Sequence, residues 1–224
     1  MTEAEYFGNW IKVIDMDKLK KAIGIIYGIS RHTEICPEYS NIFRAFHACP
    51  YNDLKVVILG QDPYPQKGVA TGIMFGNNKG TPSEKLSISL KIIKESVINF
   101  EVPHNFITFD ESLEEWEKQG ILLLNSSLTV ELGKPGSHTM IWSDFIGSLL
   151  KKLSEYNNGL VYLLLGKTAQ SFEPYIDSST NTILKAPHPA YFARIHKKMP
   201  SSIFRELEDI VQKKFNYKLK LFDE

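Results

Sequence analysis

Polar side chains follow four short apolar runs of this chain, at the point where each run ends. A carboxylate (Asp62) follows the first run, an amide (Asn125) closes the second, a lysine (Lys167) follows the third and an imidazole (His188) follows the fourth. Taken singly, each residue has an ordinary structural explanation, because Asp and Asn often close turns by bonding nearby backbone groups. A carboxylate, an amide and an imidazole that meet in one crevice can instead bind a polar ligand and stabilise charge that develops in it.

The apolar runs that precede these residues are predicted to be strands of one sheet. They are short and bounded by turn residues, and they cover residues 55–60, 121–125, 160–166 and 182–186. Helical periodicity is found at residues 87–100, 110–119, 142–156 and 202–215. The second of these helices is expected to begin near a Thr108-x-x-Glu111 capping box and to stop at Gly120.

Strands that alternate with helices favour an α/β fold. The expected architecture is a three-layer sandwich, in which helices cover both faces of a central, mostly parallel four-stranded sheet. Parallel strands deliver their carboxyl ends to one edge, where ligands bind in open α/β sheets. The four polar residues are therefore expected to converge.

Composition limits the classes of protein that the chain can belong to. The 224 residues are 43% hydrophobic and 23% charged, which predicts a single domain over residues 1–224. Lys plus Arg number 26 and Asp plus Glu also number 26, so any attraction to nucleic acid must be local. Cys36 and Cys49 lack metal-ligand spacing and are interpreted as reduced core thiols. With neither a secretory segment nor a membrane-length apolar run, we expect a soluble, cytoplasmic protein without membrane contact.

Several motifs in chain order resemble those of the uracil-DNA glycosylases of the family 1 type. GQDPY at 60–64 matches that family's water-activating loop, and GIMF at 72–75 is similar to the segment that carries its base-stacking Phe. LLLNSSLTV at 122–130 is similar to its uracil-reading strand, and Ser137-His138 also fits. APHP at 186–189 resembles the start of its DNA-intercalation loop. The resemblance extends over most of the chain.

The resemblance implies a monofunctional hydrolase that flips uracil out of single- or double-stranded DNA and leaves an abasic site, without metal or cofactor. Breaking the N-glycosidic bond builds positive charge on the sugar and negative charge on the departing base. Asp62 would stabilise the cation and orient the attacking water. His188, as a neutral imidazole, would donate a hydrogen bond to the 2-carbonyl oxygen of the uracil anion. Backbone amides of Gln61 and Asp62 would add donors to the same oxygen.

Three further residues would select the base. Asn125 can accept from the ring N–H of uracil and donate to the neighbouring carbonyl, whereas cytosine would leave both groups mispaired. Tyr64, packed against the carbon that bears the methyl group of thymine, would exclude that base by overpacking. Phe75 would stack on the flipped ring. Without the motif context, both aromatic residues would be interpreted as ordinary core.

The resemblance also assigns residues to DNA contacts. The phosphate-binding loops would comprise Pro82, Ser83, Gly166 and Lys167. Phe192 falls where the family places an apolar wedge, and Arg194 opens a basic patch that continues at residues 196–198. The chain departs from the family pattern at Pro65, where the first motif usually ends in His. It also has Lys167 where the Gly-Ser loop usually has Ser, and an aromatic residue at the wedge position.

Two alternatives stay open on the sequence alone. One is a catalytically weak DNA-binding or polymerase-associated module on the same scaffold. That reading gives no reason for a carboxylate, an amide and an imidazole around one pocket, so the enzyme is favoured. The other alternative keeps the pocket but accepts further damaged pyrimidines. The expected partner is uracil-containing DNA and the expected state a monomer, while an inhibitor or replication partner cannot be read from the sequence.

Overall fold

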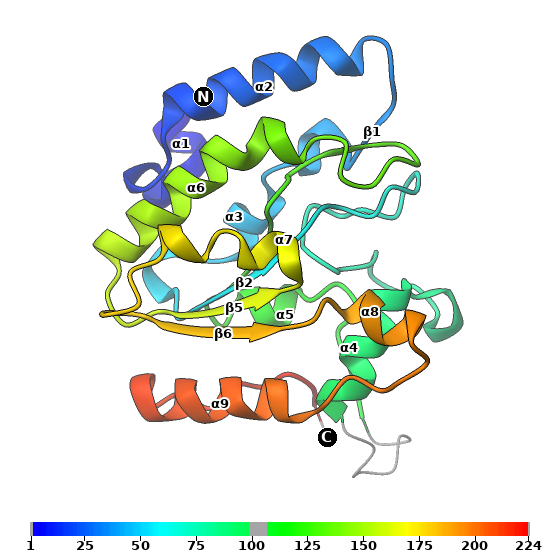
Figure 1. Ribbon diagram of the computed structural model, residues 1–224, viewed down its shortest axis with the longest axis vertical. Helices are drawn as coiled ribbons and strands as arrows, with labels where there is room; N and C mark the ends of the chain where they lie inside the picture. Colours follow the sequence, from blue (N-terminus) through cyan, green and yellow to red (C-terminus); the bar gives the residue numbers. More distant parts are fainter. Residues whose placement is uncertain (1, 99–106, 224) are drawn as a thin grey trace.

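A four-stranded sheet forms the centre of the computed structural model, which describes residues 2–98 and 107–223 (Figure 1). Its strand order is β3-β2-β5-β6, and every neighbouring pair in this sheet is parallel. The strands are β2 (Val56–Gly60), β3 (Ile121–Asn125), β5 (Val161–Leu165) and β6 (Thr182–Ala186). All four predicted strands are confirmed, to within one residue at their ends. The sheet was predicted to be mostly parallel and is wholly so.

Helices cover both faces of this sheet, as a three-layer sandwich requires (Figure 1). Alternate strand residues divide between two apolar cores, because side chains of a strand point to opposite faces in turn. Val57 and Leu59 join one core and Val56 and Ile58 the other. The helices over the first core are α1 (Glu3–Phe7), α2 (Met16–Ser30), α3 (Arg44–Ala48) and α6 (Thr139–Tyr156), with α7 (Lys167–Gln170) beside them. Those over the second are α4 (Ile88–Ile98), α5 (Glu114–Glu117), α8 (Pro189–Arg194) and α9 (Ser202–Phe215).

The helix predicted at residues 110–119 is much shorter in the structure, and its predicted capping box is wrong. Thr108 instead forms an isolated bridge with Asp223, and Leu113 has a left-handed φ of 60° that interrupts any earlier helical turn. The carboxylate of Asp110 accepts from the backbone N–H groups of Ser112 and Glu115, so it organises the entry to α5. The helix ends at Glu117, before the predicted stop, and Gly120 has a left-handed φ of 87° in the turn that leads into β3.

The other predicted helices are present with small differences in their ends. The first is α4, whose predicted residues 99 and 100 lie outside the described residues. The third, α6, begins three residues before its predicted start, and the fourth coincides with α9. Helix α2, which the sequence analysis did not predict, packs against α6. Cys36 and Cys49 are buried free thiols, as predicted.

A small second sheet and several short helical turns complete the fold. Strand β1 (Ile35–Cys36) pairs antiparallel with β4 (Val130–Glu131). The short helical turns are η1 (Gly8–Lys12), η2 (Tyr39–Asn41), η3 (Tyr51–Asp53), η4 (Ser83–Lys85) and η6 (Glu173–Tyr175). Within the described parts of the chain, no helix has the length and apolar character needed to cross a membrane.

Strand β3 lies at an edge of the main sheet, and two groups cover its outer backbone. The N–H of Leu123 donates to Oε1 of Glu117 at 3.3 Å, and its C=O accepts from the N–H of Met74 at 3.2 Å. Glu117 is fully buried, and its Oε2 has no hydrogen-bond partner among the described residues. Removal from water raises the pKa of this carboxyl well above its ordinary value. Covering an edge in this way prevents it from pairing with another chain.

Replacing Glu117 with Gln should therefore flatten the pH dependence of stability. Because the pKa is raised in the folded state, the folded chain holds a proton that the unfolded chain releases first. Wild-type stability is then full below the ordinary Glu pKa and falls as pH rises through the folded-state pKa. Glu117→Gln cannot ionise and should be more stable than wild type at neutral pH, by about 1–3 kcal/mol.

Urea unfolding between pH 4 and pH 8 measures this difference. Glu206→Gln, a change at an exposed position of α9, is the matched control and should follow the wild-type curve. Parallel curves for Glu117→Gln and wild type across this range would contradict the prediction.

Candidate active site

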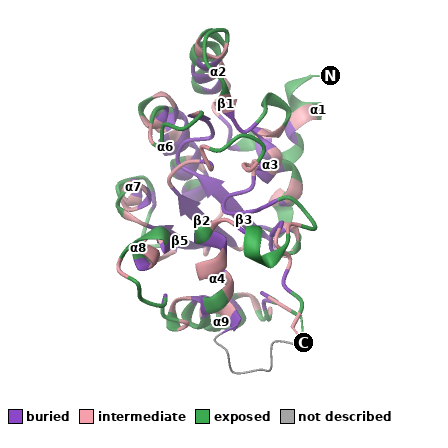
Figure 2. Cartoon of the chain, turned by 90° about the vertical axis from the view of Figure 1, so that its right-hand side faces the viewer, coloured by how far each residue is buried: buried purple, intermediate pink, exposed green. Residues whose placement is uncertain are grey.

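A cavity of about 140 Å³ lies at the carboxyl ends of the strands. In Figure 2 these strand ends point toward the viewer. Five of the residues predicted to act on the base line it together: Asp62, Tyr64, Phe75, Asn125 and His188. A dry cavity of about 150 Å³ is known to take up a single benzene ring. The hollow therefore matches one six-membered ring rather than a whole nucleotide.

Asp62 leaves β2 at the floor of this cavity and is held by hydrogen bonds. The backbone N–H of Gly136 donates to its Oδ2. Partial burial raises the pKa of Asp62 above its ordinary value, while Gly136, the Gln61 side chain and the residue's own N–H act to lower it. The loop of Gly136 is itself joined to the loop that follows β2, because Gly133 N–H donates to the Pro65 carbonyl at 2.8 Å.

His188 faces the cavity as the N-cap residue of α8. Its Nδ1 accepts from the backbone N–H of Ala190 at 3.2 Å, which leaves the proton of the neutral ring on Nε2. Burial lowers the pKa of the imidazole, because the charged form loses its hydration. The ring meets the Phe75 ring edge-on, with centroids 5.4 Å apart. At neutral pH, His188 is thus a neutral hydrogen-bond donor.

Gly166 fixes the place of this histidine. It has a φ of 89°, and a Cβ built on it would lie only 2.9 Å from the Cβ of His188. Its N–H donates to the carbonyl of Ala186 at 2.8 Å, which joins the ends of β5 and β6. Sequence reasoning assigned Gly166 to DNA contact alone and missed this packing role.

Phe75 and Tyr64 form the aromatic walls. The backbone of Phe75 has a left-handed φ of 63°, a strained conformation for a residue with a side chain. The Tyr64 hydroxyl donates to the Phe75 carbonyl at 3.0 Å, and the bond from Met74 to β3 holds the preceding residue. The Tyr64 ring is therefore anchored through its own hydroxyl, and the Phe75 ring through the hydrogen bonds of its backbone segment.

Asn125 ends β3 opposite Gly60, its register partner on β2. A Cβ at Gly60 would lie 3.0 Å from Asn125 Oδ1 and 2.4 Å from the sulfur of Met74, so only glycine leaves room for this amide. The Asn125 side chain is buried, and it forms no hydrogen bond with the residues that the structure describes. Its donor and acceptor are available to a ligand in the cavity.

Gln61, by contrast, does not line the cavity. Its carbonyl accepts from Ser127 N–H and Ser126 Oγ, each at 2.9 Å. Its side-chain Oε1 accepts from the Thr168 hydroxyl at 3.3 Å. The structure therefore places Gln61 next to Asp62 in the chain but outside the cavity.

Four of the six predicted DNA contacts lie at exposed positions, and a serine that was not predicted lines the cavity. Pro82 and Ser83 are exposed at η4. Ser89, in the first turn of α4, is only 6% exposed and lines the cavity. Sequence reasoning missed Ser89, although a serine among the apolar positions of a helix was a signal that could have drawn attention to it.

The residue predicted to be the wedge is buried. Phe192 is 7% exposed and belongs to the core under α8, whereas Tyr191 beside it is 40% exposed. The predicted loop is a helix, in which neighbouring side chains point about 100° apart. A shift of one position therefore changes which of the two rings faces outward. Arg194 is exposed, with its guanidinium 5.6 Å from the centre of the Tyr191 ring.

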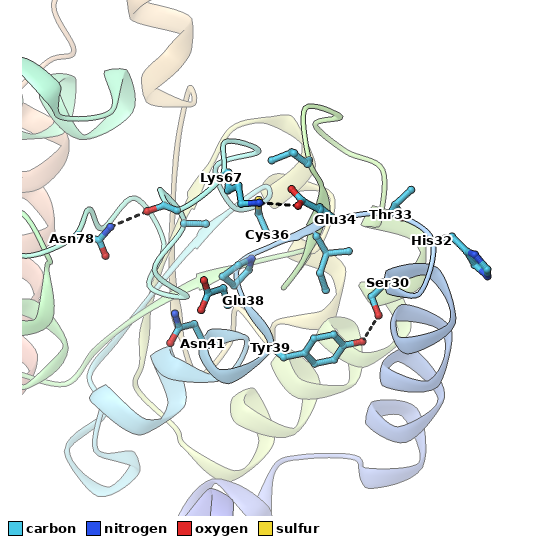
Figure 3. Close-up of a pocket in the computed structure, with 15 residues that line it drawn as sticks. Ser30, His32, Thr33, Glu34, Cys36, Glu38, Tyr39, Asn41, Lys67 and Asn78 are labelled. Atoms are coloured by element: carbon cyan, nitrogen blue, oxygen red, sulfur yellow. Dashed lines mark hydrogen bonds and ion pairs between the residues drawn. The ribbon is translucent and has the colours of Figure 1, made fainter.

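A larger hollow of about 790 Å³ adjoins this cavity, and Ala70 lines both. Figure 3 shows two pairs of its polar side chains in contact with one another. Lys67 Nζ lies 2.7 Å from Glu34 Oε1, and Ser30 Oγ lies 3.0 Å from the Tyr39 hydroxyl. Size alone would favour this hollow, but the carboxylate, amide and imidazole predicted from the sequence converge on the smaller one. Neither hollow gathers a set of metal ligands from the described residues.

Comparison with known proteins agrees with this geometry. The family model described as the uracil DNA glycosylase superfamily matches residues 46–212. The chain belongs to the uracil-DNA glycosylase superfamily. It is 40% identical over 188 residues to a uracil-DNA glycosylase of Buchnera aphidicola, covering 83% of this chain and 78% of the relative. It is 41% identical over 169 residues to one from Campylobacter jejuni, covering 74% and 70% of the two chains.

Solved structures show the same fold at lower sequence identity. A mimivirus UNG variant in complex with UGI covers 100% of this chain and 89% of its own, with a TM-score of 0.79 and 21% identity. The UNG of Nitratifractor salsuginis covers 94% of this chain and 97% of its own, with a TM-score of 0.65 and 18% identity. The four-stranded parallel sheet with helices on both faces is thus the superfamily's fold.

Adding a methyl group at Gly166 should displace His188. In Gly166→Ala, the new Cβ overlaps the His188 Cβ, so the ring must move toward solvent and its pKa should rise back toward about 6.5. Two-dimensional NMR of the imidazole nitrogens against pH measures both the pKa and the tautomer.

Gly159→Ala is the matched control for this experiment. Gly159 has a nearly equal φ of 90°, but a Cβ there has nothing within 4 Å. Both variants should lose similar stability through backbone strain, about 1–2 kcal/mol, and only Gly166→Ala should alter His188. An unchanged His188 titration in Gly166→Ala would show that the contact does not position the ring.

Proposed function

We propose that this protein excises uracil from DNA by hydrolysing the bond between the base and the deoxyribose, which leaves an abasic site for base excision repair. The observation that carries the proposal is the single-ring cavity in which Asp62, Asn125 and His188 converge. Membership of the superfamily and the curated relatives named uracil-DNA glycosylase support it. Nothing in the structure or the comparisons favours the binding-module alternative.

The two catalytic residues match the two charges of the reaction. As the bond breaks, positive charge develops on the sugar, and the ionised carboxylate of Asp62 stabilises it and orients the attacking water. Negative charge develops on the departing uracil, and the Nε2–H of neutral His188 donates to its 2-carbonyl oxygen. The hydrogen bonds to Asp62 keep it anionic although it is partly buried.

Asn125, Tyr64 and Phe75 select the base. The unpaired Asn125 amide pairs with the ring N–H and adjacent carbonyl of uracil, whereas cytosine would mispair at a cost of about 1–3 kcal/mol for each group. The Tyr64 ring is held in place by its bond to the Phe75 carbonyl, so it cannot yield to the methyl group of thymine. Phe75 stacks on the uracil ring, and its strained backbone sets the position of that stacking face.

We propose that the DNA backbone lies across the residues around the cavity mouth. The exposed Ser83 and Lys167 contact phosphates, and Gly166, Pro82 and Arg194 border the same strand. Tyr191 replaces Phe192 as the proposed wedge, because it is the exposed aromatic residue of α8. An inserted ring holds open the stack from which the uracil has been extruded.

Some finer points remain proposals. We propose that the protein acts as a monomer on single- and double-stranded DNA. We also propose that it works in the cytoplasm, because the two curated relatives named above are bacterial and bacterial DNA lies in the cytoplasm. One related UNG was solved in complex with UGI, and we propose that this chain also binds a protein of that kind.

Asp62→Asn keeps the shape of the carboxylate while removing its charge. The variant should bind uracil-containing DNA as wild type does but excise uracil about 10²–10³-fold more slowly. Matched oligonucleotides that carry uracil, thymine or cytosine at one site, assayed in chelator, report excision as alkali-sensitive abasic sites. Only the uracil substrate should be cleaved. Wild-type rates in the variant, or equal cleavage of all three bases, would overturn the assignment.

Tyr191→Ala and Phe192→Ala distinguish the two candidate wedges. Loss of an exposed wedge should slow excision from duplex DNA about tenfold or more, leave excision from single strands unchanged and leave stability unchanged. Loss of a core ring should instead destabilise the fold by about 3–5 kcal/mol. Excision on both substrates and thermal unfolding measure these effects. Wild-type duplex activity in Tyr191→Ala would contradict the assignment of Tyr191.

A further inference from the structure

We propose that the buried hydrogen bond between Thr129 and His138 positions the loop that holds the carboxylate of Asp62, so that both are positioning residues. The inference rests on the proposed function, which makes Asp62 catalytic. The loop lies between β4 and α6, at residues 132–138, and is called the β4–α6 loop below. Neither Thr129 nor His138 lines the cavity, so each acts through this loop.

The β4–α6 loop contacts the segment from Asp62 to Pro65 at two points, both through its backbone. The N–H of Gly133 donates to the Pro65 carbonyl at 2.8 Å, and the N–H of Gly136 donates to Oδ2 of Asp62. Pro135, between these two glycines, lines the cavity. The loop therefore holds the segment that carries the carboxylate at both of its ends.

Local sequence explains why the Gly136 N–H is available to another residue. Pro135 and Gly136 are the central residues of a β-turn, which the N–H of Ser137 closes by donating to the carbonyl three residues before it at 3.2 Å. Gly136 has a left-handed φ of 81°, the conformation that the third position of a type II turn requires. The turn's own hydrogen bond does not use the N–H of that position, so this N–H can donate to Asp62.

A buried network of side chains anchors the end of this loop. The Thr129 hydroxyl oxygen lies 2.9 Å from Nδ1 of His138, the last residue of the loop. The indole N–H of Trp142, in the first turn of α6, donates to the same oxygen at 2.8 Å. All three side chains are buried. The backbone extends the anchor to the β-turn, since the N–H of Thr139 donates to the Gly136 carbonyl at 3.2 Å.

Hydrogen-bond chemistry gives each group in this network one role. An indole N–H only donates, so the Thr129 oxygen accepts from Trp142 and its hydroxyl proton is left for His138 Nδ1. Burial lowers the pKa of His138, although Glu131 acts to raise it, so the ring is neutral at neutral pH and its Nδ1 can accept. The His138 side chain forms no capping bond to α6, so the Thr129 hydroxyl is what holds it.

Thr129→Val tests the proposal, because valine keeps the shape and removes the hydroxyl. The end of the loop should then move, and the Gly136 N–H should no longer hold Asp62. This should lower kcat for uracil excision about fivefold, the value of one hydrogen bond, with little change in KM. Loss of a donor to its charged form should raise the pKa of Asp62, so the acid limb of the pH–rate profile should move to higher pH.

Carboxyl ¹³C NMR shows whether Asp62 is the group whose pKa has moved, and it does not depend on excision. The other titratable groups that line the cavity are Tyr64 and His188. At the base of the loop, Lys134 and Glu131 form an ion pair with one another. None of these groups is altered in Thr129→Val, so the Asp62 resonance should shift its midpoint to higher pH in that variant.

Three further variants complete the design. Thr129→Ser restores a hydroxyl and should recover both the rate and the profile. Ser154→Ala is the matched control, because it also removes a buried hydroxyl with two partners, the Asp177 N–H and Asn181 Nδ2. Ser154 lies near the other end of α6, so this variant should lose stability and keep the wild-type kcat and acid limb. In an Asp62→Asn background, Thr129→Val should have no additional effect on kcat, because the carboxylate through which it acts is gone.

If Thr129→Val does not fold, two variants of His138 make the same comparison. His138→Leu removes the acceptor and should be impaired. In His138→Asn the amide oxygen takes the place of Nδ1, so this variant should resemble wild type. Equal impairment of the two would contradict the proposal.

The outcomes separate this inference from the proposed function. If wild type excises uracil but Thr129→Val has the same kcat, acid limb and Asp62 titration, the positioning role is wrong and the function stands. If Ser154→Ala or Thr129→Ser is as impaired as Thr129→Val, the hydroxyl of Thr129 is not the acting group and the inference is overturned. If wild type does not excise uracil, the proposed function fails, while a shifted Asp62 titration in Thr129→Val would still support the positioning of its carboxylate.

Discussion

On the proposed reaction, the site depends on keeping one partly buried carboxylate ionised, so that it can stabilise the positive charge that develops on the sugar. Burial raises the pKa of Asp62, and three groups act against that rise: the N–H of Gly136, which donates to its Oδ2, the Gln61 side chain and the residue's own N–H. Dipoles of this kind stabilise an anion while leaving its charge available, whereas an ion pair would cancel part of the field at the sugar. The position of the loop that carries Gly136 follows from this requirement.

Close backbone approach is the second constraint, and glycine meets it at two strand ends. Gly60 leaves room for the Asn125 amide, and Gly166 leaves room for His188. Both positions lie where parallel strands end side by side, so the sheet register sets the distances between the functional groups. A side chain at either glycine would separate groups that have to contact one ring. The sheet thus fixes the spacing of the strand ends, and the two glycines leave room for the neighbouring side chains to reach the same cavity.

The alternation of apolar strand runs with helical periodicity predicted the sheet and the sandwich. The polar residues that follow those runs, together with the family motifs, predicted five residues of the cavity. Details that depend on the rotation of a short helix were not accessible. Helix α8 turns Phe192 inward and Tyr191 outward, and neither ring type nor spacing distinguishes them. The left-handed Leu113 likewise shortened a helix whose composition favoured ten residues. Ser89 stands among the apolar positions of its helix, but only the tertiary structure shows that it faces the cavity.

The opposite responses of Asp62 and His188 to burial explain how one pocket can serve two charges. Burial disfavours both charged forms. It leaves His188 neutral, with its proton on Nε2 because Nδ1 accepts from the Ala190 N–H. It raises the pKa of Asp62, and the donors around the carboxylate oppose that rise. On the proposed reaction, the sugar cation then lies between two anions, the carboxylate and the departing uracil, and is attracted by both. A protonated histidine would stabilise the uracil anion more strongly than a neutral one. In so small a cavity, however, its positive charge would also offset the field of the Asp62 carboxylate at the sugar. A neutral donor stabilises the leaving base without weakening the carboxylate, so the two pKa values have to be set together.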